Sequence, residues 1–248
     1  MTQECHETLE TLRVTLSGKN DPAVVVALCT HVQLPNAAQP LALERSGVTL
    51  VGCCGVEGNE NKDDNHGNKC TITRSGQGRN LIVTGSNFSM HNTILQNGFV
   101  DDSVNTQRQE ACGANLLFNN KNDDNCHNNV PSSCVQTSDC EFLQGQCWSG
   151  IAANEGGNVH IETATGGSAC VDLSKFASGK ARFGGGVAVV GASKVILEAC
   201  EVEENQGSGM AHFVWDFSNP AIKNPGQDIL IHDSAFANNQ GEFGGAIF

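Results

Sequence analysis

Two short stretches of the sequence concentrate the oxygen ligands that calcium binds. Residues 61–66 read Asn-Lys-Asp-Asp-Asn-His, and residues 122–127 read Asn-Asp-Asp-Asn-Cys-His. Calcium takes about six to eight oxygens, mainly from carboxylates and carbonyls. The candidate calcium ligands are Asp63, Asp64, Asp123 and Asp124. Neither stretch has the residue order of an EF-hand or its final Glu, so a solvated acidic loop without metal is the favoured alternative.

Cysteine is the second residue type that indicates chemistry, either metal binding or disulfide formation. The chain has 12 cysteines in 248 residues, and none forms a Cys-x-x-Cys pair. Zinc ribbons require such closely spaced pairs, so a disulfide framework formed in an oxidising compartment is the better interpretation. The candidates for disulfides are Cys5, Cys29, Cys53, Cys54, Cys70, Cys126, Cys134, Cys140, Cys147, Cys170 and Cys200.

Some pairings among these cysteines are expected, although spacing alone does not fix the connectivity. Either Cys53 or Cys54 is expected to bond Cys70 and close the first acidic loop, and Cys5 is expected to bond Cys29. The four cysteines of one loop-like stretch, 126–147, are expected to form two bridges. Cys170 and Cys200 both follow strand patterns, so they either bond each other or serve as small core residues.

Composition and charge indicate a secreted protein that binds neither nucleic acid nor the membrane interior. The net charge of −13 repels phosphate backbones. No run of about 18 apolar residues could span a bilayer. Asn87-Phe88-Ser89 is an N-glycosylation acceptor, which makes Asn87 a candidate glycan site. The sequence opens at Met1 without an apolar signal region, so we expect either that the signal has been removed from this numbering or that the sequence is a fragment.

A repeat indicates the elements that must position these residues. Residues 195–207 (VILEACEVEENQG) and 229–241 (ILIHDSAFANNQG) align without a gap, with Val202 opposite Phe236. Residues 88–97 are a third copy. Each unit holds short apolar strands, a small residue, and an Asn-rich turn, and Gly-rich segments precede several units. Strands this short cannot form a core alone, but stacked coils pair them in parallel around a common interior.

The sequence therefore predicts an all-β protein, a right-handed parallel β-helix, in which Asn side chains stack into a ladder at a turn. A β-sandwich is the less favoured alternative. Residues 1–20 are expected to form a capping α-helix, because leucines recur at helical spacing within 3–16. The β-helix is expected over 21–248, with loop insertions near 55–70 and 101–147. The final GGAIF lacks a polar cap, so we expect this end to be truncated or covered by another chain.

The repeats resemble those of known proteins. Phe236-Ala-Asn-Asn followed by Gly-Gly-Ala-Ile-Phe is similar to the repeats of polymorphic outer-membrane, adhesin-type proteins. The N-terminal half resembles secreted pectin-lyase-like β-helix proteins of microalgae, on segments such as ALCTHVQL and PLALERSGVTLVGCCG. This superfamily includes polysaccharide lyases and hydrolases, adhesins and surface proteins. The resemblance therefore implies the fold more strongly than any activity.

The favoured hypothesis is an extracellular structural or adhesive β-helix that joins other protein chains, or copies of itself, at a cell surface, wall or appendage. A polysaccharide-binding module is the second hypothesis, although the chain has no Tyr and only two Trp. The third is a calcium-dependent polysaccharide lyase or a hydrolase. Lyases of this fold place calcium beside a basic residue, yet the arginines Arg74, Arg79, Arg108 and Arg182 are scattered and no Asp cluster recurs beside one.

Overall fold

A computed structural model gives the fold. The residues that it describes are 4–6, 24–36, 38–54, 69–101, 113–120, 135–148, 156–163, 168–191, 194–213, 228–242 and 244–248. Within these ranges the regular structure is all β-strand, with no α-helix, and every pair of named strands runs parallel. No described segment is a helix long and apolar enough to cross a bilayer.

The strands form three large parallel sheets, which we name A, B and C. Sheet A contains β1 (Glu4–His6), β2 (Val24–Leu28), β5 (Val48–Gly52), β8 (Phe88–His91), β12 (Val135–Ser138), β16 (Ser168–Asp172), β19 (Lys194–Glu198) and β22 (Asp228–His232). Sheet B contains β3 (Val32–Leu34), β6 (Cys70–Arg74), β9 (Thr93–Gln96), β13 (Glu141–Leu143), β17 (Lys175–Ala177), β20 (Glu201–Glu203) and β23 (Ala235–Ala237). Sheet C contains β4 (Leu41–Leu43), β7 (Leu81–Val83), β11 (Leu116–Asn120), β15 (Val159–Thr163), β18 (Val187–Val190) and β21 (Met210–Phe213). A smaller pair joins β10 (Phe99–Asp101) to β14 (Gln146–Trp148).

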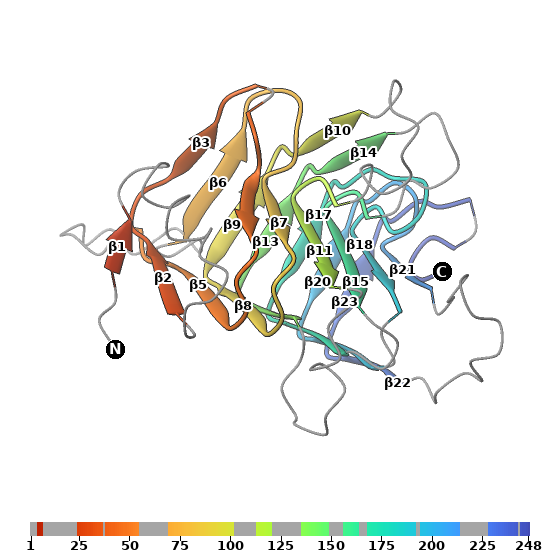
Figure 1. The fold of residues 1–248 in the computed structure, drawn as a ribbon. Coiled ribbons are helices and arrows are strands. Elements are labelled where there is room, and N and C mark those ends of the chain that lie inside the picture. The colour runs from red at the N-terminus through yellow and green to blue at the C-terminus, as the bar shows by residue number, and fades with distance from the viewer. Residues whose placement is uncertain are drawn as a thin grey trace, which may run out of the picture.

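The chain visits the sheets in a fixed order, A then B then C, and each round of this path is one coil. Each new coil adds one strand to the same edge of each sheet, so sequence order and stacking order agree. Figure 1 shows the result, a stack of coils that runs from the N-terminus to the C-terminus. The predicted all-β stack of parallel strands is therefore confirmed, and its arrangement is consistent with a β-helix-like solenoid.

The core forms because successive side chains along each strand alternate between the interior and the outer face. In β5 and β6, alternate residues are buried and the residues between them are partly exposed. Since the strands pair in register, the buried residues of successive coils stack on one another. Phe142 and Phe176 illustrate this, with ring centroids 5.0 Å apart and an interplanar angle of 10°. One continuous apolar core therefore runs along the solenoid.

The corners between sheets contain residues with left-handed backbone conformation (positive φ), which recur at the same position in successive coils. At the corner from sheet A to sheet B these are Asn92, Asp139, Leu173, Ala199 and Asp233, with φ between 45° and 52°. Asn and Asp tolerate this conformation, whereas Leu and Ala adopt it at a cost. The stacked neighbours above and below therefore impose the corner geometry even where the residue type is unfavourable.

Buried asparagines form a ladder beside the corner that leads into sheet C. Asn80 donates to Asn115 Oδ1 at 2.9 Å, and Asn115 donates to Asn158 Oδ1 at 2.9 Å. Farther along, Asn205 donates to Asn239 Oδ1 at 2.9 Å. This confirms the predicted stacking of Asn side chains, and two of its members, Asn205 and Asn239, lie in the Asn-Gln-Gly turns. The amides also bind main-chain groups, so the ladder satisfies turns that would otherwise bury unpaired polar atoms.

The register confirms the repeat seen in the sequence. Ile229 pairs with Val195 and Phe236 pairs with Val202, as the ungapped alignment requires. The predicted N-terminal helix over 1–20 is wrong at residues 4–6, which form β1 and pair with β2. There, pairing with a sheet edge overrides a weak helical spacing. The rest of that segment lies outside the described residues.

The predicted loop insertions near 55–70 and 101–147 fall largely outside the described residues. The acidic segment 55–68 lies outside the described residues, but the stretch 101–147 contains four strands, from β11 to β14. Of these, β11 belongs to sheet C, β12 to sheet A and β13 to sheet B, and all three continue the stack of coils. Their buried residues are few and are separated by corners, so a search for periodicity in a long window misses them.

Candidate functional site: the open C-terminal coil

The last described coil packs against the coil before it on one side, and no described strand pairs with it on the other side. It consists of β22, β23 and the segment around Ile247. Main-chain hydrogen bonds hold this segment on β21, from Met210 N to Ala246 O and from Phe248 N to Met210 O, both 2.9 Å. Both β22 and β23 are the terminal strands of their sheets, so one edge of each carries no strand among the described residues.

Side chains that are buried in every earlier coil are exposed in this one. Val195 and Met210 are at most 1 % exposed, whereas the residues in the same inward positions, Ile229 and Ile247, are both 44 % exposed. Ile231 and Phe236 still pack against the core but are only partly buried. Among the described residues, inward positions are therefore covered in the earlier coils and partly exposed in the last one.

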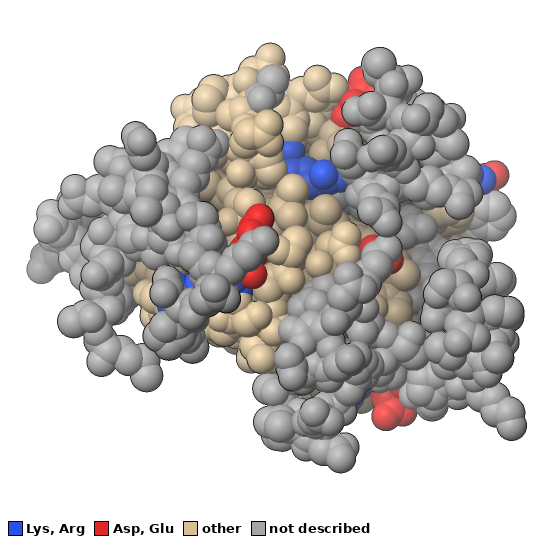
Figure 2. Space-filling view, viewed as in Figure 1, with Lys and Arg blue, Asp and Glu red and all other residues tan. Residues whose placement is uncertain are grey.

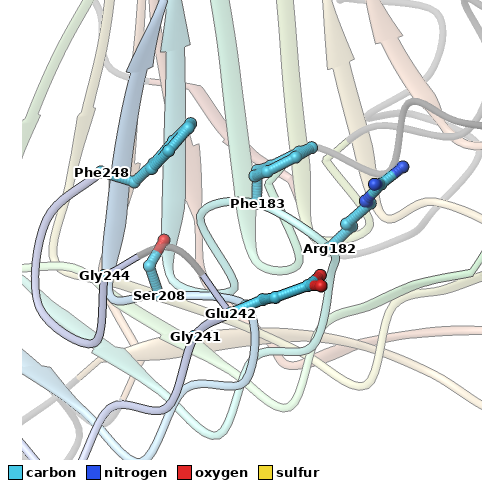
Figure 3. Close-up of a pocket in the computed structure, with 8 residues that line it drawn as sticks. Arg182, Phe183, Ser208, Gly241, Glu242, Gly244 and Phe248 are labelled. Atoms are coloured by element: carbon cyan, nitrogen blue, oxygen red, sulfur yellow. The ribbon is translucent and has the colours of Figure 1, made fainter.

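An aromatic pair borders the open end. The rings of Phe183 and Phe248 stack with centroids 5.3 Å apart at an interplanar angle of 21°. The Arg182 guanidinium lies 5.2 Å from the centroid of the Phe183 ring. Figure 3 shows Glu242 extending toward the same side as Arg182, below the two rings. The hollow between these residues is too small to enclose a water molecule.

The predicted calcium ligands Asp63, Asp64, Asp123 and Asp124 lie outside the described residues. Within the described ranges, no three His, Cys, Asp or Glu side chains come together in a way that could hold a metal ion. On the face drawn in Figure 2, the described acidic and basic atoms lie in small separate groups. The described part of this face therefore offers no single charged patch to a ligand.

Among the described arginines, Arg74 has a clear structural role. Arg74 is nearly fully buried, and its guanidinium donates to the main-chain oxygens of Pro35, Ala38 and Gln77 at 3.2, 2.8 and 3.3 Å. It therefore fixes the corner between sheets B and C. Arg45 is also buried. Arg182, at the rim of the open end, is exposed.

The structure shows the state of some of the cysteines that were predicted to form disulfides. Cys54 bonds Cys70, which resolves the choice between Cys53 and Cys54, and Cys29 is also in a disulfide. Cys126 and Cys134 lie outside the described residues. Cys5 lies in β1, Cys147 is buried in β14, and Cys53 lies beside the Cys54–Cys70 bridge.

Three predicted disulfide candidates, Cys140, Cys170 and Cys200, instead carry free thiols. Cys140 and Cys200 occupy a buried corner position that Ser174 fills in the coil between them. Their Sγ atoms donate to main-chain oxygens, for example from Cys140 to Met90 at 3.3 Å. Cys170 points outward from β16, since it pairs in register with the outward residue Ile196. Cys170 and Cys200 therefore face opposite sides of the wall and cannot bond each other.

A buried ion pair escaped the sequence analysis. Lys69 Nζ lies 3.0 Å from Glu141 Oε1 and 2.9 Å from Asp139 Oδ1, and the Lys69 and Glu141 side chains are 9 % and 8 % exposed. Burial lowers the pKa of Lys69, but hydrogen bonds and charge attraction from Asp139 and Glu141 outweigh it, so the pKa is raised overall. The partners stand 72 residues apart along the chain, and no local pattern signals their meeting.

Asn87 is exposed and has a φ of 53°, in the turn that leads into β8. Its side chain is therefore accessible as a glycan site requires. Comparison with protein families, with curated proteins and with solved structures finds no match.

Proposed function

We propose that this chain is a structural or adhesive β-helix of an extracellular assembly. The observation that carries the proposal is the stack of parallel coils, in which three long parallel sheets enclose one continuous apolar core. A stack of coils offers long regular faces along its length, which suit contact with other chains.

The complete architecture in this proposal is a right-handed parallel β-helix of the pectin-lyase-like kind. The fixed A, B, C order of the sheets supports it, because each return to a sheet is a parallel crossover connection. Such connections are right-handed in about 98 % of cases. The resemblance of the repeats to adhesin-type and microalgal β-helix proteins points the same way.

An extracellular location is part of the proposal. The Cys54–Cys70 disulfide and the disulfide at Cys29 support an oxidising compartment. The exposed acceptor Asn87 is compatible with a secretory route. The buried, hydrogen-bonded corners and the asparagine ladder would give such a protein a stiff body suited to a load-bearing or spacing role.

The test is to locate the protein on the cells that make it. An antibody raised against the folded chain should label intact, unpermeabilised cells, and the protein should remain with the wall or surface fraction after washing in salt. A cytosolic marker, which must stay unlabelled, controls for leakage. Labelling that appears only after permeabilisation would rule out the surface role.

A further inference from the structure

A cysteine thiol lies against the disulfide that ties β5 to β6. Cys54 bonds Cys70, and the residue before Cys54 in the chain, Cys53, carries a thiol. The main-chain nitrogen of Cys53 donates to Cys70 Sγ at 3.2 Å. Three covalent bonds join that nitrogen to the Cys53 sulfur, so rotation about the Cα–Cβ bond moves the thiol beside the disulfide.

The main chain holds Cys53 and the disulfide together. Leu28 O accepts from Cys53 N at 2.7 Å and lies 2.8 Å from Cys70 Sγ. Gly52 allows this close packing, because a Cβ at that position would lie 2.9 Å from Cys70 N. The chain at 52–53 therefore passes directly beside Cys70.

The disulfide and the thiol differ in their access to solvent. Cys54 is 6 % exposed and Cys70 is 0 % exposed, so the fold shields both sulfurs from a thiol in solution. Cys53 is partly exposed. A disulfide is exchanged when a thiolate attacks one of its sulfurs. Cys53 is therefore placed to contact the buried disulfide on one side and solvent on the other.

We propose that Cys53, Cys54 and Cys70 form a thiol–disulfide exchange site, through which a small thiol such as glutathione reacts with the buried disulfide. In the first step the Cys53 thiolate attacks Cys70 Sγ. The Cys53–Cys70 bond forms, the Cys54–Cys70 bond breaks, and Cys54 leaves as a thiolate that takes up a proton. The number of disulfides is unchanged, so this step needs no oxidant or reductant.

The small thiol enters in the second step and modifies Cys53. Its thiolate attacks Cys53 Sγ, the sulfur nearer to solvent, and Cys70 leaves as a thiolate that takes up a proton. Cys53 now carries the small thiol as a mixed disulfide. A second small thiol attacks the bound one, and the two depart as their own disulfide while Cys53 becomes a thiol again. Two electrons have then passed to Cys54 and Cys70.

This exchange would control how one coil is closed. The disulfide joins the chain just after β5 in sheet A to the first residue of β6 in sheet B, across a sequence separation of 16. Strand β6 also pairs with β3 and β9. Reduction would therefore release the tie between the two sheets and leave β6 in the stack.

The first test is the rate at which glutathione reduces the Cys54–Cys70 disulfide in the folded full chain. Acid stops the reaction, N-ethylmaleimide labels the thiols, and peptide mapping by mass spectrometry measures the labelled fraction of Cys70. Cys53→Ser should slow the reduction at least about tenfold, because the buried disulfide loses its neighbouring nucleophile.

Cys170→Ser is the matched control for this rate. It removes another partly exposed thiol, on the outer face of sheet A and away from the disulfide, and should leave the rate unchanged. Circular dichroism confirms that each variant is folded. Equal rates for Cys53→Ser and the parent chain would overturn the proposal.

A second variant tests whether Cys53 can bond Cys70. Mild oxidation of Cys54→Ser should produce a Cys53–Cys70 disulfide, which peptide mapping detects. The double variant Cys53→Ser with Cys54→Ser is the control and should leave Cys70 as a thiol. A folded Cys54→Ser chain that keeps Cys53 and Cys70 as thiols after oxidation would also overturn the proposal.

The mixed disulfide identifies the sulfur that the small thiol attacks. At limiting glutathione, peptide mapping of the parent chain should find the glutathionyl group on Cys53. Its presence on Cys54 or Cys70 instead would show direct attack on the disulfide and rule out the relay. These measurements use purified protein, so their outcome is independent of the surface role, which the labelling of cells tests.

Discussion

At the scale of single residues, burial decides the chemistry of the free thiols. Desolvation raises the pKa of Cys140 from 9.0 to about 12, and it also raises the pKa of Cys200. The thiolate is the reactive form, so these two side chains are inert in the folded state. Cys170 lies on the outer face of sheet A and is only partly buried.

Alkylation with iodoacetamide at pH 8 should therefore distinguish the three thiols. A pKa near 12 leaves only about one Cys140 in ten thousand as thiolate at pH 8. Peptide mapping should find the label on Cys170 in native protein, and on Cys140 and Cys200 only after unfolding. Cys170→Ser removes the native label at that peptide and serves as control. Rapid labelling of Cys140 in the native protein would contradict the burial of its thiol at the corner.

The buried ion pair between Lys69 and Glu141 makes a second prediction at this scale. Lys69→Met leaves the Glu141 carboxylate buried without its cation, which should lower the free energy of unfolding by about 3–5 kcal/mol. Urea unfolding at pH 7.5 measures the loss. Because the pKa of Lys69 is raised in the folded state, the contribution of this pair is complete below pH 10.5 and is lost as the pH rises through the folded pKa.

Two further variants separate this buried pair from a general effect of charge. Lys175 also bonds two acids, Glu201 and Glu203, but at a more exposed place on sheet B, so Lys175→Met should cost at most about 1 kcal/mol. Adding Glu141→Leu to Lys69→Met should recover much of the lost stability, since no buried charge then remains. Equal losses for Lys69→Met and Lys175→Met would show that burial is not the cause.

At the scale of elements, the asparagine ladder links one corner to the next. Asn115 accepts from Asn80 and from Gly98 N, and donates to Asn158 and to Leu143 O, all at 2.9 Å. Its buried amide thus serves four partners in neighbouring turns. Gly98 allows this approach, because a Cβ at that position would lie 2.1 Å from Ala114 O.

Asn115→Ala should accordingly lower the free energy of unfolding by at least about 3 kcal/mol, since several buried polar groups lose their partners together. Chemical denaturation followed by circular dichroism measures this. Gln136→Ala, on the exposed outer face of sheet A, should stay within about 0.5 kcal/mol of the parent. A cost for Asn115→Ala as small as that of Gln136→Ala would mean that the ladder contributes little.

At the scale of the whole molecule, a solenoid is stable through contacts between neighbouring coils. A strand in the middle, such as β16, pairs on both sides, whereas β22 pairs with one strand, β19, among those the structure describes. Stability should therefore fall toward the open end, as in other repeat architectures.

Hydrogen exchange of dilute protein tests this gradient. We expect amides in β22 and β23 to exchange at least about tenfold faster than those in β16 and β17. Uniform protection along the stack at low concentration would show that the molecule opens only as one unit.

The sequence by itself determined the repeat, and through it the stacking of coils. The ungapped match of 195–207 with 229–241 set the register of β19 on β22, because inward positions recur with the same spacing in each coil. The asparagine ladder was predictable for the same reason. The strands within 135–148 were not predictable, because they are three or four residues long. The left-handed corners between them are not marked by a consistent residue type.

Only the tertiary structure decided contacts between distant residues and which apolar groups face solvent. Lys69 and Glu141 meet because coils that lie far apart in sequence stack in space. Cys140 and Cys200 proved to be corner thiols, since their positions alternate with serine along the stack and face no second cysteine. Exposure of Ile229 and Ile247 depends on what lies beyond the last coil, and a pattern that is identical in buried and terminal strands cannot reveal that.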